Sequence, residues 1–136
     1  MVDGDTIVLA DGRHVRLVQI DAPEVSEGEC YGGEAKRALE RILPRGAAVR
    51  VEADPNLDSS DRFGRRLAYV LKDGLNVNLE LVRRGAAAPY LFHGDRGRYA
   101  NALVLAATQA QGDRRGLWGA CPGTVLNPYR QIDARP

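Results

Sequence analysis

The 136-residue sequence has no long apolar run, few aromatic residues and only two cysteines. Its longest weakly polar run, Leu103 to Ala107, is far shorter than the roughly 20 residues that a membrane-spanning helix needs, so we expect no membrane span. No signal peptide is visible, yet Met1 directly precedes a motif with functional residues. We therefore expect the sequence to begin after a removed leader, as in a secreted or extracytoplasmic protein.

The two cysteines, Cys30 and Cys121, do not have the spacing of a zinc site, and no histidine accompanies either of them. Two interpretations remain. The pair forms a disulfide that ties the C-terminal segment to the body of the protein, or both residues are buried thiols. The even cysteine count and the missing leader favour the disulfide.

Neither positive nor negative charge is in large excess, because the net charge is +1. This argues against a protein that coats nucleic acid by bulk electrostatics, but an enzyme that acts on nucleic acid needs only local cationic groups. Such groups are present in two clusters, which consist of Arg13 and Arg16 and of Arg62, Arg65 and Arg66. Arginine clusters of this kind are also common on solvated faces.

Apolar periodicity and turn residues predict short strands separated by helices. We expect strands at residues 6–9, 15–20, 48–53, 67–71 and 75–77 and helices at residues 35–43, 79–84 and 98–111. This order fits an α+β fold, namely a five-stranded Greek-key β-barrel of the OB type with three α-helices. We expect one domain over residues 1–120 and an irregular tail over residues 121–136.

Two carboxylates stand at the ends of the first predicted hairpin. Asp5 opens its first strand and Asp21 closes its second, so antiparallel pairing places both at the same end. Two close carboxylates repel each other unless a cation lies between them, and a hard divalent ion with oxygen ligands meets this need. Alternatively, both residues are ordinary turn aspartates.

Arg16 and Glu24 flank the same strand end. Arginine matches the oxygens of a phosphodiester with two parallel hydrogen bonds and stays charged at any working pH. A metal ion, two arginines and one carboxylate base form a complete set for the attack of water on phosphorus. The pattern therefore predicts phosphodiester hydrolysis.

Three segments together resemble the staphylococcal nuclease family: D-G-D-T, R-x-x-x-x-D-x-P-E, and D-R-F-G-R-x-L-A-Y followed by V-N-x-x-L-V-R-x-G. The resemblance extends from Val2 to about Trp118. It implies an OB-fold enzyme that hydrolyses DNA and RNA with Ca²⁺. It also implies cleavage on the 5′-oxygen side, which leaves 3′-phosphate products.

The resemblance assigns a role to each motif residue. Asp5 and Asp21 match the calcium carboxylates, and Ala22 matches a position that binds the ion through its backbone carbonyl. Arg16 and Arg65 match the two arginines that clamp the phosphate. Glu24 matches the proposed general base.

Four further residues match positions that bind substrate. Arg62 stands where the staphylococcal enzyme has a lysine near a nucleotide phosphate, and Phe63 replaces a tyrosine there. Tyr90 and Phe92 resemble a tyrosine pair that lines the base pocket. We expect a monomer with DNA and RNA as substrates, and the alternative is a non-catalytic OB-fold module that binds nucleic acid or a protein partner.

Overall fold

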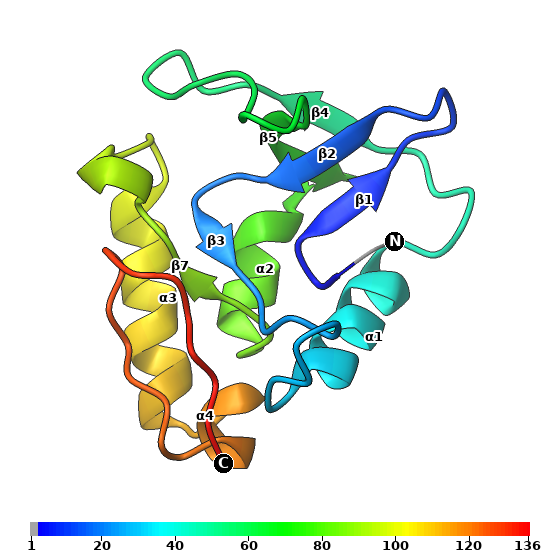
Figure 1. Ribbon diagram of the computed structural model, residues 1–136. Helices are drawn as coiled ribbons and strands as arrows, with labels where there is room; N and C mark the ends of the chain where they lie inside the picture. Colours follow the sequence, from blue (N-terminus) through cyan, green and yellow to red (C-terminus); the bar gives the residue numbers. More distant parts are fainter. Residues whose placement is uncertain (1–2) are drawn as a thin grey trace.

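The structure is a computed structural model that describes residues 3–136. Met1 and Val2 lie outside the described residues, and with them the start of the expected domain and of the family resemblance. Figure 1 shows the strands crowded into the upper part of the molecule, with helices below and to one side. Among residues 3–136, no helix has the length and apolar composition to cross a membrane.

Within residues 3–136, seven short strands form two sheets. The larger sheet has the order β1-β2-β5-β4, with β6 also paired to β5, and the smaller one joins β3 to β7. The strands are β1 (Thr6–Val8), β2 (His14–Leu17), β3 (Ile20–Asp21), β4 (Arg50–Glu52), β5 (Arg66–Lys72), β6 (Leu75–Asn76) and β7 (Ala88–Pro89). Only β2 and β5 run parallel, so the larger sheet is mixed.

Four α-helices and one 3₁₀ turn complete the fold. They are α1 (Gly32–Ile42), α2 (Val77–Arg83), η1 (Phe92–Gly94), α3 (Ala100–Gly112) and α4 (Leu117–Ala120). The α+β class is therefore confirmed. The three expected α-helices are all present. A fourth, the short α4, forms in a segment that we expected to be irregular because of its prolines.

A closed five-stranded barrel is not seen among the described residues. The larger sheet ends at β1 on one side and β4 on the other, and no pairing joins these two edges. β1 spans three residues, and Asp3 already bridges back to Thr6, so little backbone remains on this edge to meet another strand. The five-stranded element is an open sheet in this part of the chain.

The predicted apolar stripe of α1 is confirmed. Ala35, Ala38, Leu39 and Ile42 are all buried, and they recur at the three- and four-residue spacing of one helix face. α2 packs against the same core. Its fully buried Asn78 donates a hydrogen bond to the carbonyl oxygen of Val18 at 2.9 Å. This amide fixes α2 against the turn between β2 and β3, which leads to Asp21.

The expected strand at residues 15–20 is interrupted. β2 ends at Leu17, and Gln19 adopts a left-handed backbone conformation with φ 67° before β3 begins at Ile20. The buried Gln19 side chain explains this conformation, because it accepts a hydrogen bond from the Gly97 N–H at 2.9 Å and donates one to the Asp95 carbonyl at 3.1 Å. Because of this break, the backbone of Asp21 pairs with β7 in the smaller sheet and not with the strands of the larger one.

The C-terminal tail, residues 121–136, contains no helix or strand but packs against the body. Ile132 and Ala134 are buried in a second apolar cluster with Leu117 and Trp118. In Figure 1 the tail returns along α3 and past β7 toward the lower end of the molecule. It therefore lies beside β3, which carries Asp21.

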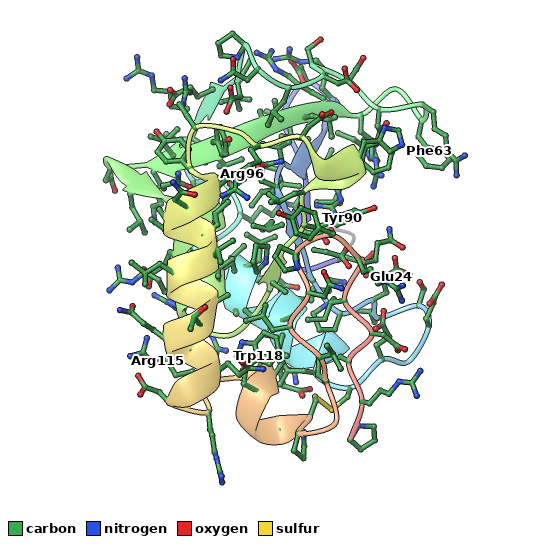
Figure 2. The ribbon with its side chains drawn as sticks, turned by 90° about the vertical axis from the view of Figure 1, so that its left-hand side faces the viewer. Glu24, Phe63, Tyr90, Arg96, Arg115 and Trp118 are labelled. Carbon is green, nitrogen blue, oxygen red and sulfur yellow. A yellow bond between two sulfur atoms is a disulfide. The ribbon has the colours of Figure 1, made fainter. Side chains whose placement is uncertain are left out.

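The disulfide between Cys30 and Cys121 is confirmed. The two sulfur atoms lie 2.09 Å apart and the Cα atoms 6.1 Å apart, and the bond closes a sequence separation of 91 residues. It appears as the yellow bond in the lower part of Figure 2. The bond ties the start of the C-terminal tail to the segment just before α1.

We predict that loss of this disulfide lowers the free energy of unfolding by at most roughly 4–5 kcal/mol, the chain-entropy value for a loop of about 90 residues. Denaturant unfolding of Cys30→Ala, Cys121→Ala and the double variant measures it. The double variant is expected to be no less stable than the less stable single one, because either change alone already removes the bond. Additive losses, or two titratable thiols in the unfolded, unreduced protein, would contradict the prediction.

Candidate functional site

One cleft of about 580 Å³ brings together almost all of the residues singled out by sequence. Those that line it are Asp5, Arg16, Asp21, Glu24, Arg62, Phe63, Arg65, Tyr90 and Phe92. Figure 2 shows the labelled residues Phe63, Tyr90 and Glu24 along the same side of the molecule, with Trp118 and Arg115 away from it. Ala22 is the exception, because it is buried behind the cleft wall and does not line it.

Two buried carboxylates face one arginine at the base of the cleft. The Nη2 atom of Arg16 lies 3.3 Å from Oδ2 of Asp5 and 3.2 Å from Oδ1 of Asp21. The other terminal nitrogen, Nη1, donates to the carbonyl oxygens of Leu17 at 2.7 Å and Ile20 at 2.9 Å. The hairpin register, which pairs Thr6 with Arg16, produces this arrangement.

Backbone contacts also orient the two carboxylates. Oδ2 of Asp5 accepts a hydrogen bond from the Ala22 N–H at 2.8 Å. Gly4 permits this close approach, because a Cβ atom there would lie 3.1 Å from the side chains of both Ala22 and Ala35. Oδ2 of Asp21 accepts a hydrogen bond from the Ile132 N–H at 2.8 Å.

The charges of this group do not balance. Two carboxylates face one guanidinium, and the surplus negative charge lies in a buried region. Burial raises the pKa of Asp21 to about 7, Arg16 opposes the rise, and the neighbouring Asp5 adds to it. Hard carboxylate oxygens with a deficit of positive charge fit a divalent cation such as Ca²⁺, so Asp5 and Asp21 are the residues that could hold one, whereas Ala22 does not line the cleft.

Glu24 is half-buried at the rim of this group. Burial raises its pKa above the ordinary value, and the nearby carboxylates of Glu27, Asp3 and Glu29 raise it further. Gly32, at the start of α1, packs so tightly against Glu24 that a Cβ atom would lie 2.9 Å from the Glu24 carbonyl oxygen. A carboxyl group with an elevated pKa at a cleft rim is suited to exchange a proton with a bound molecule.

Arg65 directly precedes β5, the strand that pairs with β2, and is held by Asp61. Oδ2 of Asp61 accepts a hydrogen bond from Nε of Arg65 at 2.7 Å, and its Oδ1 accepts the Arg65 N–H at 2.9 Å. The terminal nitrogens of Arg65 form no ion pair among the described residues. The guanidinium is therefore anchored at one edge, while its other edge is available to an anion.

Aromatic rings line the outer part of the cleft. Phe63 is 69% exposed, and the guanidinium groups of Arg62 and Arg65 lie 4.8 and 5.5 Å from its ring centre. The rings of Tyr90 and Phe92 lie 6.0 Å apart, edge to face. The Tyr90 N–H donates to the Gln19 carbonyl at 2.8 Å, so the Gln19 turn also places this pair.

Sequence reasoning missed three residues that support the site: Gln19, Glu29 and Ile132. Asp61 was quoted within a motif but given no role. An aspartate four residues before Arg65 is a detectable signal for a local ion pair. No local signal could identify the other three, because their contacts join segments that lie far apart in the sequence.

Comparisons with known proteins identify the family. Residues 14–120 match the family model described as staphylococcal nuclease homologue. The chain is 38% identical to Protein ParB of Escherichia coli over 131 residues, which cover 87% of this chain and 68% of ParB. It is 31% identical to Endonuclease YncB of Bacillus subtilis (strain 168), covering 93% of this chain and 62% of YncB.

A further relative shows the same domain inside a longer protein. The chain is 32% identical to Endonuclease YhcR of Bacillus subtilis (strain 168) over 144 aligned positions, which cover 95% of this chain but 12% of YhcR. The family match and the endonuclease relatives thus define a nuclease. The chain belongs to the staphylococcal nuclease family.

Proposed function

We propose that this protein is a calcium-dependent nuclease that hydrolyses DNA and RNA on the 5′-oxygen side of the phosphodiester and leaves 3′-phosphate products. The observation that supports this most directly is the meeting of Asp5, Arg16 and Asp21 at the base of a cleft whose walls carry Glu24 and Arg65. Family membership supports the same reaction class. It also supports an OB-type arrangement of the strands.

Each residue of the candidate site has a distinct role in the proposed reaction. Glu24 takes a proton from the attacking water, and its raised pKa brings it closer to neutral pH. Arg16 on β2 and Arg65 just before β5 come from two strands that pair with each other, and they offset the negative charge that develops on the phosphate oxygens. Asp5, Asp21 and the Ala22 carbonyl would hold Ca²⁺, which when bound would act as a Lewis acid toward a phosphate oxygen.

The outer cleft is proposed to hold the nucleotide without reading its sequence. Phe63, Tyr90 and Phe92 offer ring faces for base stacking, and Arg62 supplies a cation for a neighbouring phosphate. Stacking and phosphate contacts tolerate every base, because each base has an aromatic face and each nucleotide a phosphate. This supports activity on both DNA and RNA.

The disulfide supports a further property of the enzyme. The Cys30–Cys121 bond is typical of an oxidising compartment, which supports a secreted or extracytoplasmic location. A monomer is our expectation for the assembly.

We predict that Glu24→Gln lowers kcat by about 10²–10⁴-fold, the usual contribution of a general base, because the amide cannot accept the proton. Binding of a non-hydrolysable oligonucleotide should change little, since the arginines remain. Glu27→Gln is the control, because it removes the same charge from the same loop. Near-wild-type turnover of Glu24→Gln would remove Glu24 from the mechanism.

Arg65→Lys should lower kcat by at least about 100-fold although the charge is kept. A lysine ammonium cannot reproduce two parallel hydrogen bonds to phosphate, and loss of one stabilising donor typically costs this much. Arg66→Lys is the matched control, because Arg66 is adjacent but does not line the cleft. If Arg65→Lys kept most of the activity, Arg65 would contribute only general electrostatics.

Activity should require Ca²⁺, with rates about 100-fold lower in Mg²⁺. Calcium accepts irregular shells of about six to eight oxygens at roughly 2.3–2.6 Å, whereas magnesium requires a tight octahedron near 2.0–2.1 Å. Small misplacement of reacting groups lowers a rate by about this factor. Rates in chelated buffer, with each metal restored at saturation, measure the difference, and equal rates or full activity with neither metal would contradict the proposed site.

A further inference from the structure

Two carboxylates hold the loop that carries Glu24: Oδ1 of Asp3 accepts a hydrogen bond from the Val25 N–H at 3.1 Å, and Glu29 contacts Glu24 itself. Oε1 of Glu29 accepts a hydrogen bond from the Glu24 N–H at 3.1 Å. The Glu29 N–H in turn donates to the Glu24 carbonyl oxygen at 3.2 Å, so the two residues are joined in both directions. The residues between them, Val25 to Gly28, are exposed, and this double link closes their loop.

Glu29 also joins this loop to the C-terminal tail. Its second oxygen, Oε2, accepts a hydrogen bond from the Ala134 N–H at 3.1 Å. Two residues earlier, the Ile132 N–H donates to Oδ2 of Asp21. One short stretch of the tail therefore contacts both the metal-ligand candidate Asp21 and the residue that fixes Glu24, across more than 100 positions of sequence.

The tail itself is well anchored, so it can transmit this restraint. Its first residue, Cys121, is bonded to Cys30, which directly follows Glu29. Ile132 and Ala134 are 8% and 6% exposed and pack in the second apolar cluster. The Leu91 N–H donates to the Pro128 carbonyl at 2.7 Å, which adds a contact close to Tyr90 and Phe92.

We infer that Glu29, held by the C-terminal tail, is a positioning residue that sets the placement of Glu24 relative to Asp5 and Asp21. This inference rests on the proposed function. Glu29 acts through the backbone of Glu24 and does not contact the substrate itself. Residues in such supporting contacts commonly change activity or metal affinity by about 10- to 100-fold when altered.

Glu29→Gln is the most selective test. Glu29 accepts hydrogen bonds at both oxygens, whereas glutamine has one acceptor oxygen and an NH₂ group that only donates. The variant is nearly isosteric but must lose one of the two bonds. Glu27→Gln is the control, because it removes a charge from the same cluster of carboxylates without breaking either hydrogen bond.

A second pair of variants tests the tail side of the contact. Ala134→Pro removes the N–H that donates to Oε2 of Glu29. Asp133→Pro is its control, because Asp133 is exposed and its N–H makes no hydrogen bond within residues 3–136. If Glu29 and Ala134 act through the same contact, the double variant Glu29→Gln with Ala134→Pro should lose less activity than the sum of the two single losses.

The readouts separate positioning from simple loss of stability. Glu29→Gln is expected to lower kcat about 10- to 100-fold with little change in KM or melting temperature. Glu27→Gln, which removes a charge that raises the pKa of Glu24 but breaks neither hydrogen bond of Glu29, should lower kcat much less. In the metal-free protein, hydrogen exchange at the amide of Glu24, at that of Ala134, or at both should be faster in Glu29→Gln. Calorimetric titration with Ca²⁺ reports any change in metal affinity independently of turnover.

Each outcome has a definite meaning. Equal kcat for Glu29→Gln and Glu27→Gln in an otherwise active enzyme would overturn the inference and leave the proposed function intact. A loss that parallels the fall in melting temperature would also overturn it, because Glu29 would then serve stability alone. Absence of nuclease activity in the wild-type protein with Ca²⁺ would overturn the proposed function and the inference together.

Discussion

The contact of Arg16 with Asp5 and Asp21 is the interaction on which the rest of the site depends. Two carboxylates that are both more than 90% buried would repel each other strongly, and one guanidinium offsets only part of their charge. Arg16 is held in turn by backbone carbonyls at the end of β2. The hairpin, the strand break and the acidic motif are therefore parts of one electrostatic arrangement.

The surrounding fold serves to keep this arrangement rigid. The Gln19 turn directs Asp21 out of the larger sheet and, through its side chain and carbonyl, also holds the segment from Tyr90 to Gly97. Asn78 fixes α2 behind the same turn. The two walls of the cleft are thus connected by buried polar contacts, which are costly to break because each would leave an unpaired group away from water.

The tail adds a second layer of restraint from the far end of the chain. The Ile132 N–H donates to the carboxylate of Asp21, and the disulfide keeps the tail next to the segment before α1. A backbone donor suits this place, because it adds no charge to a region that already has a surplus of negative charge. Residues 121–136 lack regular structure but still shape the site.

The sequence by itself determined the α+β class, the stripe of α1, and the motif residues that line the cleft, because these follow from local periodicity and from short motifs. It favoured the disulfide but left buried thiols possible. Only the tertiary structure decided the open edge of the sheet, the Gln19 turn, and the contacts of Glu29 and Ile132. These depend on hydrogen bonds between segments up to 111 positions apart, and no local pattern in a single sequence encodes which distant backbone group will meet a given carboxylate.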